Sequence, residues 1–254
     1  MTARRDQHFL VDERAVERIL SLAEVSGKTV LEVGPGKGVL TRALLDRGAA
    51  VVAVEIDPVL VEELRSIFAP EIADGSLNLL EGDALKVELP PFEIVVSNLP
   101  YSISSPITFR LLERGFSEAI LMYQAEFAEK MAARVGTPAC GRLTVMVQTY
   151  ADVKRCIHIP PNAFSPRPQV HSTVVRIIPR DPPCPIGDKK HYADVVRVLF
   201  SQRRKTVRNG LRSGKGIFGA DRVERMISSL PPETLALRPE ALSLRDFAAI
   251  AAVV

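Results

Sequence analysis

The sequence predicts an α/β fold with a mostly parallel sheet, followed by a small all-helical C-terminal domain. Between Thr29 and Val96, short apolar runs alternate with amphipathic stretches, which is the pattern of βαβ units. A glycine-rich turn follows the first of these runs, where open α/β sheets bind their ligands. Beyond a proline cluster at 179–185, the pattern becomes helical for the rest of the 254 residues.

Strands are expected where β-branched and apolar residues run together, and helices where apolar residues recur every three or four positions. Gly48 is placed to end one helix, and Pro58 to occupy the first turn of the next. The loop 160–169 contains four prolines, so it is predicted to be neither a helix nor a central strand. The expected strands are 29–33, 50–56, 77–82, 93–98, 118–124, 154–160 and 170–178, the last two forming a hairpin, and the expected helices include 39–48, 58–68, 105–115 and 237–250.

The composition is that of a folded protein, with 46% hydrophobic and 25% charged residues. The first ten residues, MTARRDQHFL, lack the apolar core of a signal peptide, and no apolar run approaches the roughly 18 residues of a membrane span. The three cysteines, Cys140, Cys156 and Cys184, are widely spaced and form no CxxC pair. These features favour a cytoplasmic protein with no disulfide, no membrane anchor and no metal site.

Charge is distributed unevenly along the chain. Residues 1–180 carry 20 Lys and Arg against 22 Asp and Glu, whereas residues 181–254 carry 13 against 8. We place a domain boundary at the proline cluster, which gives domains 1–180 and 181–254. The positive excess of the second domain indicates contact with a polyanion.

The segment from Gly34 to Gly38, GPGKG, directly follows the first expected strand and opens a helix. Glycines such as Gly34 and Gly36 let a ligand approach the backbone closely, although a purely structural turn is the alternative. Glu55 ends the second strand, where it can accept hydrogen bonds from ribose hydroxyls. Asp83 ends the third strand and can bind an adenine amino group, with a helix N-cap as its alternative role. Together these residues predict a nucleoside-containing cofactor.

Asn98 ends the fourth strand and is followed by Leu99, Pro100 and Tyr101. The nitrogen of an aromatic amine is a poor nucleophile because its lone pair is delocalised into the ring. The Asn98 side-chain oxygen and the Leu99 carbonyl can accept its two N–H bonds, which favours a pyramidal nitrogen. Pro100 drives Leu99 into an extended backbone, and Tyr101 can stack on a base taken out of its helix.

A neutral amide also suits a donor that carries positive charge, because a carboxylate at this position could pair with the donor instead of the amine. No general base is required, since the nitrogen becomes acidic once alkylated. We therefore predict methyl transfer from S-adenosylmethionine to an amino nitrogen.

These motifs together resemble the small-subunit rRNA adenine dimethyltransferase family along nearly the whole chain. Three further segments carry the resemblance: QHFL at 7–10, FSPRP at 164–168 and FSQRRKTVRN at 200–209. Tyr123-Gln124, followed by Glu126-Phe127-Ala128, is more similar to archaeal or eukaryotic members than to bacterial ones.

The resemblance implies a Rossmann-like class I methyltransferase sheet of seven strands and a small helical domain. It also implies dimethylation of two adjacent adenosines near the 3′ end of small-subunit rRNA, within a pre-small-subunit particle, and we expect a monomer. The residues implied to contact the cofactor are His8, Leu10, Gly34, Gly36, Glu55, Asp83 and Asn98, and the residues of the amine site are Asn98, Leu99, Pro100 and Tyr101.

Phe164 lies in a loop stiffened by Pro161, Pro166 and Pro168, which lowers the entropy cost of holding its ring in place. We expect Phe164 to complete a sandwich around the adenine opposite Tyr101. The alternative is that its ring is a hydrophobic plug beneath a surface loop.

The RNA-facing surface is predicted between Arg197 and Lys215, which include seven basic residues and no acidic one. At helical spacing, Phe200, Val207 and Leu211 share an apolar face, while basic residues occupy an adjoining flank and can meet phosphates. A solvated charged face is the alternative. The candidate RNA-binding residues are Arg203, Arg204, Lys205, Arg208 and Arg212.

Two other functions remain open at this point. One is a large-subunit rRNA adenine N6-methyltransferase of the kind that confers antibiotic resistance, although Leu99 and residues 200–209 are more similar to the small-subunit group. The other is a non-catalytic ribosome-assembly or RNA-binding factor of the same fold. His158, His171 and His191 lack metal-ligand spacing and are assigned to packing or to the surface.

Overall fold

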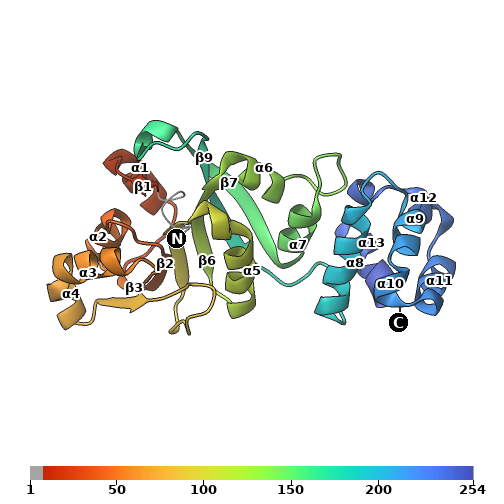
Figure 1. Ribbon diagram of the computed structural model, residues 1–254, viewed down its shortest axis with the longest axis horizontal. Coiled ribbons are helices and arrows are strands. Elements are labelled where there is room, and N and C mark those ends of the chain that lie inside the picture. Colours follow the sequence, from red (N-terminus) through yellow and green to blue (C-terminus); the bar gives the residue numbers. More distant parts are fainter. Residues whose placement is uncertain (1–7, 254) are drawn as a thin grey trace. The chain divides into compact units, whose positions relative to one another are not determined.

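A computed structural model of the chain describes residues 8–253. The chain divides into two compact units (Figure 1). The first consists of residues up to Ala128 together with Asp152–Pro179, and the second of Glu129–Ala151 together with Arg180 onward. Among the described residues, no helix combines the length and apolar character needed to cross a membrane.

A seven-stranded sheet forms the framework of the first unit, as predicted. Its order is β4-β3-β2-β5-β6-β9-β7, and the pairs from β4 through β6 are parallel, whereas β9 is antiparallel to β6. The predicted neighbours β7 and β9 lie side by side at one edge. The bounds are β2 Thr29–Val33, β3 Ala50–Glu55, β4 Leu77–Glu81, β5 Ile94–Asn98, β6 Glu118–Gln124, β7 Ala151–Ile159 and β9 Ser172–Pro179.

Both faces of the sheet are covered, which explains why the central strands are almost continuously apolar. Val30, Ile94 and Ile120 face a core shared with helix α1, while the alternate residues Leu31 and Val95 are equally buried. Pro58 begins α3 after the N-cap Asp57, as expected. The helices of this unit are α1 Glu13–Leu20, α2 Val39–Leu45, α3 Pro58–Ile67, α4 Ala69–Ala73 and α5 Ser104–Arg114.

A second, two-stranded sheet joins the N-terminal segment to the proline-rich loop. Strand β1 (Phe9–Leu10) pairs antiparallel with β8 (Phe164–Ser165), so that Leu10 lies opposite Phe164. A single 3₁₀ turn, η3 (Pro161–Ala163), precedes β8. The loop therefore contains no long helix and no strand of the main sheet, in agreement with its prolines.

The second unit is helical, and its core includes residues from the middle of the chain as well as the C-terminal ones. Cys140 and Val145 pack in one cluster with Tyr192 and Leu199, and the Tyr192 hydroxyl hydrogen-bonds Thr149 Oγ1 at 2.8 Å. Residues 129–151 therefore group with this unit, which differs from the single boundary expected at residue 180. The helices are α7 Arg142–Tyr150, α8 Lys189–Ser201, α9 Val207–Ser213, α10 Lys215–Phe218, α11 Ala220–Ser229, α12 Pro232–Ala236 and α13 Leu244–Ala252, with a 3₁₀ turn η4 at Pro239–Ala241, and α6 Ala125–Met131 contains the junction between the units.

The last helix starts later than the sequence indicates. It was expected over 237–250, but α13 begins at Leu244, after Ser243. Ser243 and Asp246 form a capping box, in which Asp246 N donates to Ser243 Oγ and Ser243 N to Asp246 Oδ2. This cap fixes the start of α13 and leaves the preceding residues in the turn η4.

Gly38 provides a test of the turn that opens α2. Its φ of +78° is left-handed, and a Cβ there would lie 2.5 Å from Phe68 Cε2. Gly38→Ala is expected to lower the free energy of unfolding by about 2 to 5 kcal/mol, combining left-handed strain with a forced shift of the Phe68 ring. Gly75→Ala is the control, because Gly75 has a φ of +82° but open space around it. It should lose only about 1 to 2 kcal/mol. Equal losses in urea denaturation would show that the Phe68 contact contributes nothing.

Candidate active site

A cavity of about 520 Å³ opens at the carboxyl ends of β2, β3, β4 and β5 in the first unit. Parallel pairing brings these four strand ends to one edge, which is the place where open α/β sheets bind ligands. The volume lies within the range typical of small-molecule sites. The predicted site residues that line it are His8, Leu10, Gly34, Gly36, Glu55, Asp83, Asn98, Leu99, Pro100 and Tyr101.

The glycine turn after β2 is closed in by its neighbours. Gly34 has a φ of +70°, and a Cβ there would lie 3.3 Å from the Pro100 ring. Gly36 has a φ of +59°, and a Cβ there would lie 2.6 Å from the ring of Phe9. Glycine at both positions therefore allows the N-terminal segment and the residues after β5 to contact the turn directly.

Glu55 organises the floor of the cavity through its carboxylate. Its Oε1 accepts hydrogen bonds from Ile56 N at 2.9 Å and from Asp57 N at 3.0 Å, and its Oε2 accepts one from Gly36 N at 3.2 Å. The side chain is only 5% exposed. Each carboxylate oxygen has two acceptor positions, so Oε2 retains one for a ligand hydroxyl.

Asp83 lines the cavity at the end of β4 and also caps a local turn. Leu85 N donates to its Oδ1 at 2.9 Å, and this bond holds the pKa of the Asp83 carboxyl below its usual range. Lys86 Nζ lies 3.3 Å from Oδ2. No helix follows Asp83, so the helix N-cap considered from the sequence is absent, and the carboxylate caps a turn in the cavity wall instead.

Glu32 is a further cavity residue, one for which the sequence predicted no role. Burial raises the pKa of its carboxyl to about 8, opposed by the Thr41 hydroxyl that donates to Oε2 at 2.6 Å, while the charge of Glu55 raises the pKa further. The apolar strand around Glu32 could have signalled it, because a buried carboxyl in such a strand seldom ionises freely.

The orientation of the Asn98 amide is set by the N-terminal segment. Asn98 Nδ2 donates to the main-chain oxygen of His8 at 3.0 Å. Because that oxygen can only accept, the NH₂ group must face His8, and the side-chain oxygen turns the other way. Asn98 thus presents an acceptor, as the predicted amine site requires.

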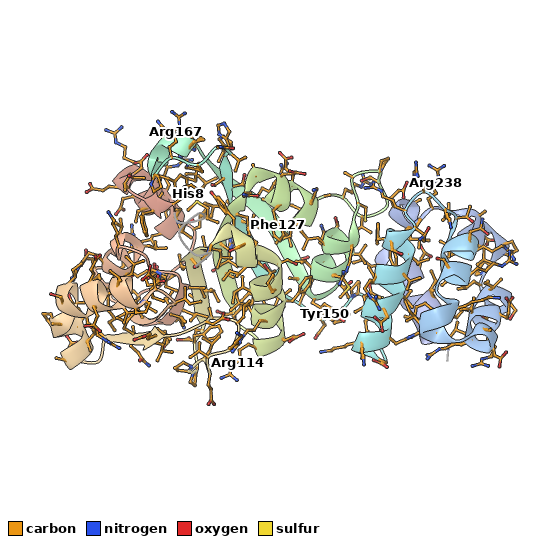
Figure 2. All side chains as sticks on the ribbon, viewed as in Figure 1. His8, Arg114, Phe127, Tyr150, Arg167 and Arg238 are labelled. Atoms are coloured by element: carbon orange, nitrogen blue, oxygen red, sulfur yellow. The ribbon has the colours of Figure 1, made fainter. Side chains whose placement is uncertain are left out.

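His8 and Tyr101, which line the cavity, form hydrogen bonds to the proline-rich loop and to the start of β9. His8 Nδ1 lies 2.8 Å from Pro166 O, so it carries the proton and donates it (His8 is marked in Figure 2). The Tyr101 hydroxyl lies 2.7 Å from Ser172 Oγ, and the His8 and Tyr101 rings are 5.9 Å apart. Burial raises the pKa of Tyr101, so its hydroxyl stays neutral at ordinary pH. Gln7, quoted with His8 in the sequence motif, lies outside the described residues.

Phe164 is placed differently from the other candidate residues. It is 4% exposed, belongs to the main hydrophobic core and is not among the residues lining the cavity. Its main chain pairs with Leu10, which does line the cavity. The structure therefore shows the packing position considered as the alternative, and contact with a base stays a prediction.

In the second unit, the basic segment is not one helix, which corrects the assumption of a continuous helical face. Helix α8 ends at Ser201, a turn follows, and α9 starts after Thr206, whose Oγ1 accepts a hydrogen bond from Asn209 N at 3.5 Å. Val207 and Leu211 are buried in the helical core as expected, but Phe200 belongs to α8.

The five candidate RNA-binding residues differ in their surroundings. Arg203 hydrogen-bonds Pro138 O and lies 3.8 Å from a Glu240 oxygen, so it is held within the unit. Arg204 and Lys205 are exposed in the turn between the helices. On α9, Arg212 is exposed and Arg208 is partly buried. All five cations therefore reach solvent to some extent, and Arg203 also has partners within the unit.

Comparison with known proteins identifies the family. The model of the family described as ribosomal RNA adenine dimethylase matches residues 2–251. The chain belongs to the ribosomal RNA adenine dimethylase family. The predicted membership of this family is thus confirmed, and with it a methyltransferase built on a Rossmann-like sheet.

Relatives of this dimethylase are found in archaea. It is 60% identical over 250 residues to a probable ribosomal RNA small subunit methyltransferase A of Methanospirillum hungatei, covering 98% of each chain. It is 46% identical to the protein of the same name from Halobacterium salinarum, covering 98% of this chain and 88% of that one.

Two solved structures resemble the dimethylase over its length. A dimethyladenosine transferase from Plasmodium falciparum is 27% identical, with a TM-score of 0.80 and 96% of each chain covered. The 23S rRNA methyltransferase ErmE is 28% identical, with a TM-score of 0.70, covering 96% of this chain and 98% of that one. The fold is therefore common to a dimethyladenosine transferase and to an enzyme named for 23S rRNA.

The buried Glu32 of the dimethylase makes stability depend on pH. Its pKa of about 8 lies above the 4.5 of an unperturbed glutamate, so its stabilising effect is complete below pH 4.5 and is lost as the pH rises through 8. The free energy of unfolding should fall by up to about 1.4 kcal/mol per pH unit in this window, relative to Glu32→Gln. Chemical denaturation from pH 4.5 to 9 checks this slope. Parallel profiles for the two proteins would contradict a raised pKa.

Proposed function

We propose that this protein transfers methyl groups from S-adenosylmethionine to the N6 amines of two adjacent adenosines near the 3′ end of small-subunit rRNA. The observation that carries the proposal is the Asn98 amide, whose NH₂ is held by His8 so that its oxygen faces the other way. The names of the relatives and the match to the dimethylase family support the same substrate.

The cavity has the chemistry that this cofactor needs. Glu55 retains an acceptor position for a ribose hydroxyl, and Asp83 presents a carboxylate at the end of the neighbouring strand β4. Glu32 can compensate an ammonium group by ionising, and His8 and Leu10 lie in the wall closed by the N-terminal strand. When bound, S-adenosylmethionine supplies an electrophilic methyl group on a sulfonium.

The residues after β5 prepare the amine. The Asn98 side-chain oxygen and the Leu99 carbonyl accept its N–H bonds and hold the lone pair toward the donor. Pro100 has a φ of −56° and a ψ of 128°, an extended conformation that presents the residues around it to the cavity. Because Asn98 is uncharged, it does not pair with a cationic donor in place of the amine.

Tyr101 offers a ring face for the adenine. Its hydroxyl is anchored to Ser172, which fixes the ring before a base arrives and lowers the entropy cost of stacking. Phe164 would have to leave its buried position to stack on the opposite side, whereas Tyr101, His8 and Phe9 already line the cavity.

Small-subunit rRNA is favoured over large-subunit rRNA. Likeness to ErmE shows that this fold also serves a 23S rRNA methyltransferase. The 60% identity to a relative named for the small subunit, over nearly the full length of both chains, is the stronger indication. An rRNA substrate in a pre-small-subunit particle also places the protein in the cytoplasm, where we propose that it acts as a monomer.

The test is mass spectrometry of unmodified small-subunit particles after incubation with the protein and labelled S-adenosylmethionine. Two adjacent dimethyladenosines near the 3′ end are expected. Asn98→Ala should reduce methylation by at least a hundredfold, because it removes the acceptor that holds the amine, while RNA binding stays within about twofold. Tyr101→Phe, which keeps the ring, is the milder control. Full turnover by Asn98→Ala would exclude this mechanism. A parallel incubation uses large-subunit particles, and label there in place of the small subunit would favour the other substrate.

The basic turn and α9 of the second unit provide a separate prediction. Arg204→Glu combined with Arg208→Glu should weaken rRNA binding at least tenfold at 150 mM salt, because phosphate contacts dominate such affinities. Lys190→Glu combined with Arg245→Glu changes the net charge equally and uses exposed residues outside 197–215. Cofactor affinity should be unchanged in both. Equal RNA affinity for the two double variants would remove this surface from RNA recognition.

A further inference from the structure

A second basic segment lies in the first unit, where the function above assigns the target adenine but no contact to the RNA backbone. Residues 153–179 contain four Lys and Arg and no Asp or Glu. Arg176 pairs with Glu118, so it is engaged within the protein. Lys154 and Arg167 are exposed (Arg167 is labelled in Figure 2, on the same upper side of this unit as His8).

Two histidines in this segment form a stacked pair on the surface. The rings of His158, on β7, and His171, just before β9, have centroids 4.6 Å apart and planes inclined by only 26°. Both side chains are exposed. Two adjacent imidazoles in solvent do not bury apolar area as core residues do, whereas flat exposed rings of this kind stack on unpaired bases.

The stacked pair lies at the same edge of the sheet as the amine site. Register pairs Asn98 of β5 with Met122 of β6, and Met122 with Val174 of β9, two residues beyond Ser172. Ser172, at the start of β9, therefore lies two strands across the sheet and two residues along it from Asn98. These spacings place the Cα atoms of the two residues roughly 12 Å apart. Tyr101 bridges this interval through its hydrogen bond to Ser172, the residue after His171.

The backbone of His171 is fixed at the same edge. Its carbonyl accepts a hydrogen bond from Ala125 N at 2.9 Å, directly after the carboxyl end of β6. Glu126 follows and is the carboxylate nearest to this point along the chain. The pair thus lies at the edge of the sheet that carries the amine site, on the face opposite Ser172 and Val174, with cations on both segments that carry it.

We propose that His158 and His171, together with Lys154 and Arg167, bind the RNA next to the target adenosines. The imidazole stack receives an unpaired flanking base, and the two cations contact its neighbouring phosphates. This inference rests on the proposed function, since it assigns part of the RNA to the first unit. His171 is three residues along and two strands across from Asn98, roughly 14 Å between Cα atoms, which suits a flanking nucleotide and not the reacting one.

The experiment uses the full-length protein and an unmodified transcript of the 3′-terminal hairpin of small-subunit rRNA. Affinity is measured by fluorescence anisotropy over a series of salt concentrations. His158→Ser with His171→Ser should lower the affinity about tenfold, the usual effect of removing a stacking platform. His158→Phe with His171→Phe should stay within about twofold of the wild type, because the flat rings remain.

The charge contribution is tested separately. Lys154→Gln with Arg167→Gln should reduce the slope of log affinity against log salt by about 1.4, two single-strand phosphate contacts at about 0.7 each. Lys28→Gln is the control, since Lys28 is exposed at the amino-terminal edge of the sheet and pairs with Glu93. It should leave the slope unchanged. Thermal unfolding and S-adenosylmethionine binding of each variant should match the wild type.

The outcomes separate the two proposals. Unchanged RNA affinity in the serine pair overturns this inference while the wild type still methylates rRNA, which leaves the proposed function intact. Equal loss in the serine and phenylalanine pairs overturns the stacking role. A wild-type protein that neither binds nor methylates the transcript or the small-subunit particle overturns the proposed function and this inference together.

Discussion

Parallel pairing of neighbouring strands is the constraint on which the site depends. Since β2, β3, β4 and β5 run in the same direction, the residues that follow each of them meet at one edge, although they are distant in sequence. The arrangement of the strands alone would allow the Asn98 side-chain amide to flip by 180°, which exchanges its oxygen and its NH₂ group. The hydrogen bond to His8 O removes this freedom, because the wrong orientation would place two oxygens against each other. A contact between residues 90 positions apart in sequence thus sets the direction in which the Asn98 side-chain oxygen points.

The three carboxyl groups of the cavity occupy three different environments. Glu32 is fully buried with one hydroxyl donor, so its neutral form is favoured and its pKa rises to about 8. Asp83 accepts a main-chain N–H beside solvent and Lys86, and its pKa is lowered. Glu55 is buried too, but three main-chain N–H groups donate hydrogen bonds to it. Without a ligand the neutral Glu32 lowers the negative charge of the cavity, and a cationic ligand can restore that charge by displacing the proton.

Local sequence pattern sufficed to predict the strands, the glycine turn and the acidic residues at the strand ends, because parallel pairing brings those ends together. Two features depended on contacts that no local pattern encodes. His8 bridges Asn98 and Pro166, 90 and 158 residues away. Residues 129–151 pack with the helical unit because Cys140 and Val145 complete its core, and no change of composition marks that junction. The turn before α9 carried a readable signal in Thr206, a good N-cap residue, but the continuous run of basic residues suggested one helix.

The distribution of charge along the sheet edge follows from what must meet there. The cavity acids come from β2, β3 and β4, whereas β5 contributes a neutral amide and residues 153–180, which include β9 and most of β7, carry no acid. The acids at the ends of β2, β3 and β4 attract a sulfonium donor, and the acid-free residues 153–180 attract a polyanion. If the acids were spread evenly, each ligand would be repelled by part of its own site. The neutral Asn98 lies at the boundary, where the positive donor and the negative RNA approach each other and where a charge of either sign would favour one ligand at the expense of the other.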